Sequence, residues 1–151
     1  MSNALYDFGR NEFLLGNIDW AADNFRLIMF DGNTSSYKHV TNQATDENLD
    51  DITSAGRVAD NGANMSAKTP TAVEAESTGG VADAADVTFA TVSQANSQKG
   101  DEISIYKYVS GSEATSRLLV NIDTATGLPV TPNGGDITVQ WDSGTNKIFK
   151  L

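Results

Sequence analysis

Alternation of apolar and polar side chains in the second half of the chain is the feature that most constrains the fold. Ile137, Val139 and Trp141 alternate with polar residues. Successive side chains of a β-strand point to opposite faces, so this pattern predicts a strand with one row of side chains in a core and the other toward solvent or a partner. Similar patterns predict strands at Val87–Val92, Ile103–Val109 and Leu118–Ile122.

Turn-forming sequences separate these predicted strands at short intervals. Residues 125–129 read ATGLP, residues 132–135 read PNGG and residues 142–146 read DSGTN. We expect the last of these to be a hairpin loop that joins Trp141 to a terminal strand, Lys147–Leu151. Closely spaced short strands of this kind predict a mainly β fold, an antiparallel β-sandwich or barrel-like single domain.

The first half of the chain predicts one short N-terminal helix and one buried strand. A helix over Ala4–Leu15 would place Leu5, Phe8, Phe13 and Leu15 on one apolar face and end at Gly16. The apolar run Phe25–Phe30 predicts the strand. We therefore expect one domain over residues 1–151, with a helical or arm segment (1–24), a loop-rich insertion with two or three short strands (33–78) and a β core (80–151).

Charge and composition exclude several functional classes. The 151 residues include 20 acidic and 10 basic residues and no cysteine, for a formal net charge of −10. Nucleic-acid binding relies on Lys and Arg that neutralise phosphates, so no nucleic-acid partner is expected. The longest apolar run, Leu27–Phe30, is far shorter than a membrane span, and no secretory leader is evident, so synthesis in a cytoplasm and no membrane partner are expected.

The sequence predicts no catalytic, cofactor-binding or metal-binding residues. The single histidine, His39, has no GxSxG nucleophile motif to serve. An acidic cluster in residues 46–51 lacks the alternation and central glycine of an EF-hand loop. The pairs Gly79-Gly80 and Gly134-Gly135 match neither a phosphate-binding loop nor a dinucleotide fingerprint, so we interpret them as turns.

Aromatic side chains are the candidates for contact with a partner. The N-terminal segment either contacts a partner or covers the core of its own domain, and the strand aromatics either form an exposed patch or fill a second core layer. Trp141 is in phase with Ile137 and Val139, which favours the core. The contact candidates are Tyr6, Phe8, Trp20, Tyr37, Tyr106 and Tyr108.

Four stretches resemble a known family. They are ALYDFGRNEFLLGNIDW at residues 4–20, GVADAADVTF at 80–89, the YK pair at 106–107 and ATSRLLVNIDTATGLPVTPNGGDITVQWDSGTNKIFKL at 114–151. Together they are similar to a family of small structural proteins in the virions of tailed bacteriophages. The likeness covers both ends of the chain, whereas residues 33–78 match nothing in that family.

The resemblance implies a non-enzymatic component of a phage particle. The preferred role is a capsid decoration (cement) protein on the capsid exterior, with the major capsid protein lattice and copies of itself as partners. A trimer would suit the threefold sites of a capsid. A tail or connector component and a host-surface module that binds carbohydrate are the alternatives, and a depolymerase or lysin is a third, enzymatic one.

Overall fold

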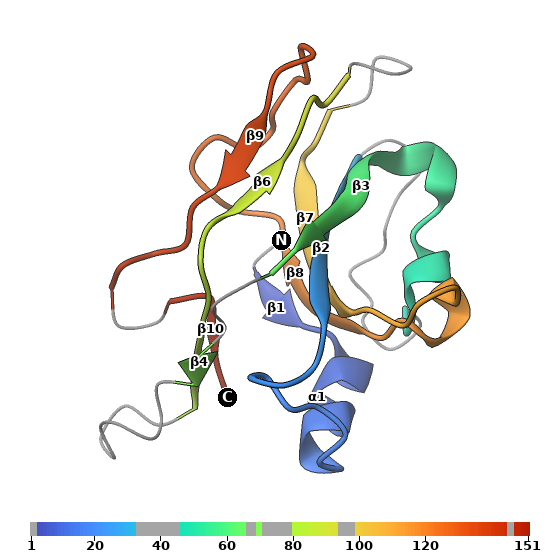
Figure 1. Cartoon of the computed structure of the whole chain (residues 1–151), viewed down its shortest axis with the longest axis vertical. Coiled ribbons are helices and arrows are strands. Elements are labelled where there is room, and N and C mark those ends of the chain that lie inside the picture. The colour runs from blue at the N-terminus through green and yellow to red at the C-terminus, as the bar shows by residue number, and fades with distance from the viewer. Residues whose placement is uncertain (1–2, 33–45, 66–68, 71–79, 94–98, 145–146) are drawn as a thin grey trace.

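The computed structural model describes residues 3–32, 46–65, 69–70, 80–93, 99–144 and 147–151. Within these ranges the chain is mainly strand, with one short α-helix and antiparallel sheets. The predicted mainly β, antiparallel class is therefore confirmed (Figure 1). None of the sheets in these ranges closes on itself, so the barrel alternative is not observed. Tyr37, His39 and much of the predicted insertion lie outside the described residues.

Five strands form the main sheet. Their order is β1 (Ala4–Leu5), β8 (Leu118–Ile122), β7 (Glu102–Lys107), β2 (Phe25–Phe30) and β3 (Arg57–Asn64). The strands β2 and β7 pair along their whole length. The predicted strands at 25–30 and 118–122 are confirmed, whereas the one predicted at 103–109 begins one residue earlier and ends at Lys107.

Both faces of the main sheet are buried, which explains the unbroken apolar run in β2. Leu27 and Met29 point into one core cluster, and Ile28 and Phe30 point into a second cluster on the opposite face. A strand covered on both faces has no polar row of side chains. The second core layer that the sequence left open for Tyr106 is therefore present.

Two smaller sheets contribute to the first cluster. Strand β6 (Val87–Phe89) pairs with β9 (Ile137–Val139), and both lie beside the main sheet in Figure 1. The second small sheet has the order β10 (Phe149–Lys150), β5 (Val81–Asp83) and β4 (Thr69–Pro70). Strands β3 and β4 both fall within the predicted insertion, 33–78.

The predicted hairpin between Trp141 and the last strand is wrong. Strand β10 pairs with β5, residue Phe149 lying opposite Ala82, and not with β9. Aromatic packing accounts for this choice, because the ring centroid of Phe149 lies 5.2 Å from that of Trp20 and 5.8 Å from that of Phe13. These contacts draw the end of the chain toward the N-terminal segment.

The N-terminal helix is shorter than predicted. The helix α1 covers Asp7–Leu14, whereas Ala4 and Leu5 form β1 and pair with β8. Gly16, with φ of +75°, follows the helix end, where a left-handed residue stops a helix. The predicted apolar face is wrong for Leu15, which follows the last helical residue as the C-cap and is 63% exposed. The helix packs on β8 through its small residue Gly9.

Three 3-10 helices complete the described structure: η1 (Leu49–Asp51), η2 (Ser54–Gly56) and η5 (Glu113–Thr115). Leu49 and Ile52 bring the η1 region onto the second core cluster. In the described ranges, no helix has the length and apolar character needed to cross a membrane.

Candidate interaction surface

Three of the predicted contact residues are enclosed by their own domain. Tyr6, Trp20 and Tyr106 are 0%, 7% and 1% exposed. Trp20 stacks on Phe25 with 4.8 Å between ring centroids, and its Nε1 donates a hydrogen bond to the carbonyl oxygen of Asp83 at 2.9 Å. The side chains of Tyr6, Trp20 and Tyr106 therefore hold the fold together and present no contact surface in this conformation.

Two predicted contact residues are half-buried, and one lies outside the described residues. Phe8 and Tyr108 each reach the surface beside an arginine. The guanidinium carbon of Arg26 lies 3.4 Å from the centroid of the Tyr108 ring, and that of Arg117 lies 5.8 Å from the centroid of Phe8. A cation over an aromatic face is stabilised by the charge distribution of the ring. Tyr37 is the candidate outside the described residues.

A polar hollow of about 370 Å³ lies next to Tyr108. Arg26, Tyr108, Glu113 and Ser116 are among its lining residues. Arg57 donates hydrogen bonds to both carboxylate oxygens of Glu113, at 2.7 and 2.9 Å, and these bonds hold the pKa of Glu113 below its ordinary value. Glu113 is thus an ionised partner of Arg57.

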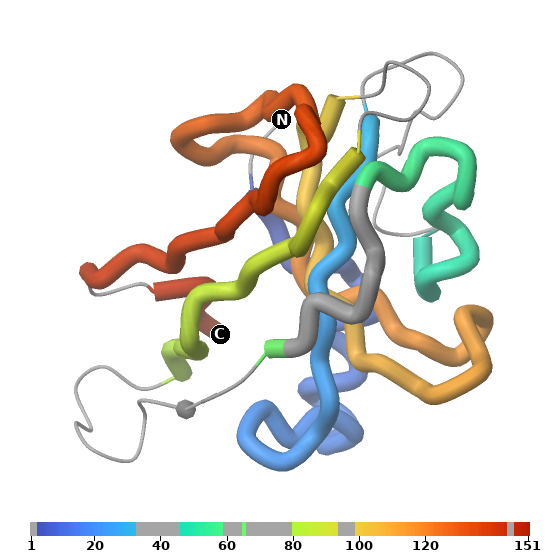
Figure 2. Tube along the Cα trace, turned by 45° about the horizontal axis from the view of Figure 1, so that its top comes forward, coloured from blue at the N-terminus to red at the C-terminus, as the bar shows by residue number. Residues whose placement is uncertain are grey.

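A less polar hollow of about 440 Å³ lies beside β9, and we call it the β9 groove. Its apolar walls come from distant parts of the chain: Met29 of β2, Ile103 of β7, Leu128 and Val130 of the preceding loop, and Ile137 and Val139 of β9. Figure 2 shows the loop that leads into β9 arching beside that strand. Gly100 lies under this loop, since a Cβ there would meet Met29 Sδ at 2.3 Å and Val130 at 3.1 Å.

The β9 groove runs along one edge of β9. Four consecutive residues, Ile137, Thr138, Val139 and Gln140, line it. Successive strand residues point to opposite faces, so a hollow under one face would be lined by alternate residues only. The other edge of β9 pairs with β6, and Val87–Phe89 do not line the groove. The groove therefore lies at the edge of β9 that pairs with no other described strand.

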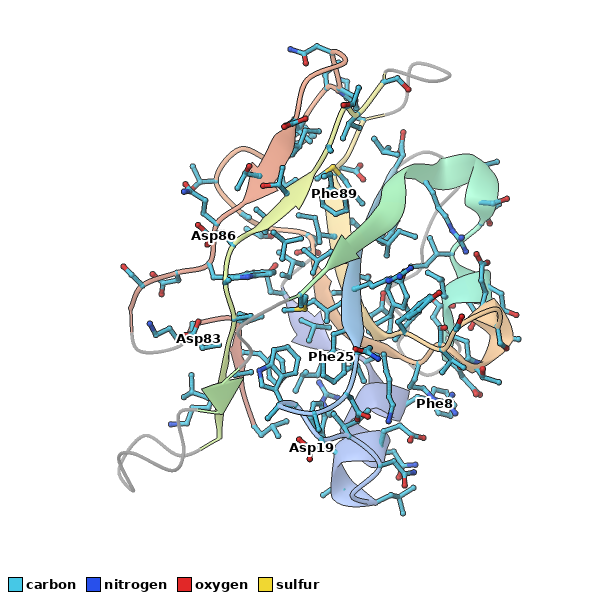
Figure 3. All side chains as sticks on the ribbon, in the orientation of Figure 1. Phe8, Asp19, Phe25, Asp83, Asp86 and Phe89 are labelled. Atoms are coloured by element: carbon cyan, nitrogen blue, oxygen red, sulfur yellow. The ribbon has the colours of Figure 1, made fainter. Side chains whose placement is uncertain are left out.

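Carboxylates flank β9 at both ends. Asp136 comes directly before the strand and accepts a hydrogen bond from the backbone N–H of Thr91. At the other end, Asp86 accepts one from the backbone N–H of Trp141 and Asp142 accepts one from Gly144, each at 3.0 Å. Asp86 lies on the stretch that leads from the small sheet into β6, as Figure 3 shows. Asp86 and Asp136 thus make their hydrogen bonds where β9 pairs with the β6 segment, and none of the three carboxylates lines the groove.

A chain of buried hydrogen bonds links Tyr6 to polar side chains of β7 and β8. Tyr6 Oη and Ser104 Oγ are 2.8 Å apart, Ser104 donates to Asn121 Oδ1 at 3.0 Å, and Asn121 Nδ2 donates to Glu102 Oε2 at 2.9 Å. Burial raises the pKa of Tyr6 well above its ordinary value. Glu102 is 0% exposed, and its Oε1 has no hydrogen-bond partner in the described part of the molecule.

Sequence reasoning identified neither Glu102 nor the β9 groove. The alternation around Ile103 and Ile105 could have placed Glu102 within a strand, but charged residues are seldom buried, so nothing indicated its position. The groove joins segments about 100 positions apart, such as Met29 and Leu128, and local patterns carry no information on such contacts.

Comparisons with protein-family models and with curated proteins find no match to this chain. Among the residues that the structure describes, no three acidic or histidine side chains are grouped in a way that could hold a metal ion. The β9 groove and its flanking carboxylates are therefore taken as the candidate interaction surface on their geometry alone.

Proposed function

We propose that this chain is a non-enzymatic structural protein of a bacteriophage virion, a decoration protein that binds the major capsid protein lattice on the outer surface of the head. On this proposal the main sheet and the smaller sheets form a β-sandwich that serves as a rigid body. Copies of the chain, arranged as a trimer, would sit at threefold sites of the capsid, so that many weak contacts act together.

The main support for the proposal comes from the ion pairs of the positively charged side chains. Five cationic side chains of the described structure are bound to carboxylates of the same chain. The pairs are Arg10–Asp7 (2.5 Å), Arg57–Glu113 (2.7 Å), Lys107–Asp23 (2.8 Å), Arg117–Glu47 (2.9 Å) and Lys147–Asp83 (3.5 Å).

With these cations paired, the excess of 20 acidic over 10 basic residues dominates the exterior. Such a surface repels packaged nucleic acid and favours a partner protein with basic surface residues. It thereby supports a position outside the shell of a particle.

A tail or connector component is the alternative location, and the same charge distribution would serve it. A carbohydrate-binding module is less well supported by the aromatic residues. Sugar-binding sites use exposed aromatic faces, but Arg26 covers one face of Tyr108, and Trp20 and Tyr106 are buried.

Particles made with and without the protein test this proposal. Decoration predicts density for the chain on the outer shell and earlier DNA release on heating when the protein is absent. Density along the tail would support the alternative location instead. Equal DNA-release temperatures for both kinds of particle would contradict a stabilising role.

A further inference from the structure

We propose that Asn133 is a self-modification site, at which the side-chain amide is lost and the residue becomes aspartate or isoaspartate. The reaction joins Asn133 Cγ to the backbone nitrogen of Gly134, and its rate is set by opening of the backbone pair between Gly134-Gly135 and Val92. Water is the only reactant from outside the chain, so this chemistry does not depend on the proposed function.

An exposed asparagine followed by glycine provides the two reacting groups. Asn133 lies exposed in the turn before β9, and asparagine is among the thermolabile residue types. Gly134 has no side chain to hinder the approach of its nitrogen, and its φ of +90° is one that glycine adopts without strain. The space beside it is open, since a Cβ built on Gly134 would meet no atom beyond its chain neighbours within 4 Å.

The Asn133 side chain already folds back over the backbone that follows it. Its Oδ1 accepts a hydrogen bond from the backbone N–H of Gly135 at 3.0 Å, so the side chain spans the peptide group of Gly134. Negative charge develops on Oδ1 when a nucleophile adds to Cγ, and a donor aimed at that oxygen stabilises the charge. The N–H of Gly135 therefore activates the amide toward attack.

The bond changes balance with water alone. The backbone nitrogen of Gly134 loses its proton to solvent, and its electron pair forms a bond to Asn133 Cγ. The bond from Cγ to Nδ2 breaks, and Nδ2 takes up a proton from solvent and leaves as ammonia, which closes a succinimide ring. Water then adds to a ring carbonyl carbon, and the bond from that carbon to the ring nitrogen breaks. Attack at Cγ gives aspartate, and attack at the main-chain carbonyl carbon gives isoaspartate.

A hydrogen bond on the attacking nitrogen holds the reaction back in the folded state. The N–H of Gly134 donates to the carbonyl oxygen of Val92 at 2.8 Å, and the N–H of Val92 donates to the carbonyl oxygen of Gly135 at 2.9 Å. Val92 is 3% exposed, which anchors this pair to the core. An amide bonded in this way loses its proton to solvent only when the structure opens locally. Ring closure therefore requires loss of the pair.

Asp136 stabilises the closed pair. Its Oδ1 accepts a hydrogen bond at 2.8 Å from the backbone N–H of Thr91, the residue before Val92. Thr91 has a φ of +52°, a strained conformation for a β-branched residue that persists only where the surrounding structure holds it. Loss of the acceptor on Asp136 would therefore release Thr91 and weaken the pair of Val92 with Gly134.

The products make a transient opening permanent. Isoaspartate lengthens the main chain at residue 133 by one carbon, which shifts Gly134 out of register with Val92. Either product also adds a carboxylate close to Asp136, where like charges repel. Reaction at Asn133 thus records that the end of the β6–β9 pair has opened.

Peptide mapping of the incubated protein tests the site. Trypsin places Asn133 in the peptide 118–147 and the second Asn-Gly pair, Asn61-Gly62, in the peptide 58–68. We expect both products at residue 133 in the folded protein, with Asn133→Asp as the aspartate standard, at a rate at least ten-fold below that in urea-unfolded protein. Equal rates would refute the protective pair. No product within a hundred half-lives of the unfolded protein would refute the site.

Matched substitutions at Asp136 test the control of opening. Asp136→Ala removes the acceptor for Thr91, and we expect it to speed both the reaction at Asn133 and amide exchange at Gly134 at least five-fold. Asp136→Asn removes the charge but keeps an oxygen acceptor, so it should change either rate less than two-fold. Equal acceleration by both variants, or none by D136A, would overturn the control by the backbone pair. The rates in urea should be the same for all three proteins.

Discussion

The backbone of Gly32 lies directly against the carboxyl group of Glu102, so that a Cβ added to Gly32 would stand 2.2 Å from Oε1 and 2.4 Å from Cδ. This contact closes the space around a fully buried side chain that Asn121 holds from the other side. A larger residue at position 32 would therefore have to displace a fully buried carboxyl group from its hydrogen bond with Asn121.

We predict that Gly32→Ala lowers the free energy of unfolding by about 2 kcal/mol, the usual cost of overfilling a packed site. Urea denaturation measures the change. In a double-mutant cycle, Glu102→Ala should remove most of the cost of G32A, because it removes the atoms that clash. Additive losses in the double mutant would mean that the two residues do not interact.

The stability of the protein should fall as the pH rises from about 4.5 to about 7. Burial raises the pKa of Glu102 from 4.5 to about 7, the hydrogen bond from Asn121 opposes this rise, and Asp101 and Asp123 add to it. Between these two values the folded state binds one proton more than the unfolded state, so each increase in pH favours unfolding. Protonated Glu102 thus contributes about 3 kcal/mol to the free energy of unfolding, and this contribution is lost once the pH exceeds the folded pKa.

Glu102→Gln isolates this effect, because the amide cannot ionise. The variant should match wild type near pH 4.5 and exceed it in unfolding free energy at pH 8, as measured by denaturant titrations across this range. Glu113→Gln serves as the control, because its carboxylate is paired with Arg57 at the surface. It should keep the wild-type slope between pH 5 and 7, and a wild-type slope in E102Q would refute the assignment.

Gly9→Ala should destabilise the protein, although alanine normally stabilises a helix interior by about 1 kcal/mol relative to glycine. A Cβ on Gly9 would lie 2.9 Å from the carbonyl oxygen of Leu118 and from the Cα of Leu119, both in β8. The helix would have to move off the sheet. Thermal unfolding should show a lower Tm for G9A, whereas Asn11→Ala, on the exposed side of α1, should leave Tm unchanged or raise it.

Trp20 should affect stability and not partner binding. Trp20→Ala removes the stack on Phe25 and the edge contact with Phe149, and we expect a loss of about 3–5 kcal/mol. Trp20→Phe keeps an aromatic ring and loses the hydrogen bond to Asp83, at a cost of about 1 kcal/mol. The fluorescence of Trp141 reports unfolding in both variants. Weaker head binding by folded W20F would assign Trp20 a contact role instead.

Local patterns were sufficient to predict individual strands. The alternation in Leu118–Ile122 and Ile137–Trp141 and the apolar run Phe25–Phe30 correspond to β8, β9 and β2, although β9 ends at Val139. The alternation of apolar and polar side chains depends only on residues that are close in the sequence, because each strand has one row of side chains on each face of its sheet. The same patterns could not predict which strands pair. The sequence predicted a hairpin between β9 and the last strand, whereas β10 pairs with β5.

Contact residues were predicted less well than strands, because residue type alone does not determine exposure. Tyr6 was a candidate for its aromatic ring, but its hydroxyl group meets Ser104, 98 positions along the chain, and this partner allows full burial. Residue type also hid the position of Glu102, because nothing in the sequence indicates a buried carboxyl group. Asn121 stabilises this group in the interior through a hydrogen bond.

The pairing of β1 with β8 has a consequence for biosynthesis. Ala4 lies opposite Asn121, and β2 finds its neighbour β7 about 75 positions later in the chain. The strands β1 and β2 are therefore synthesised long before β8 and β7, and of the neighbours of β2 only β3 is made early. The main sheet cannot be completed until residues 102–122 have been synthesised, and non-local pairing of this kind slows folding and prolongs the exposure of apolar segments.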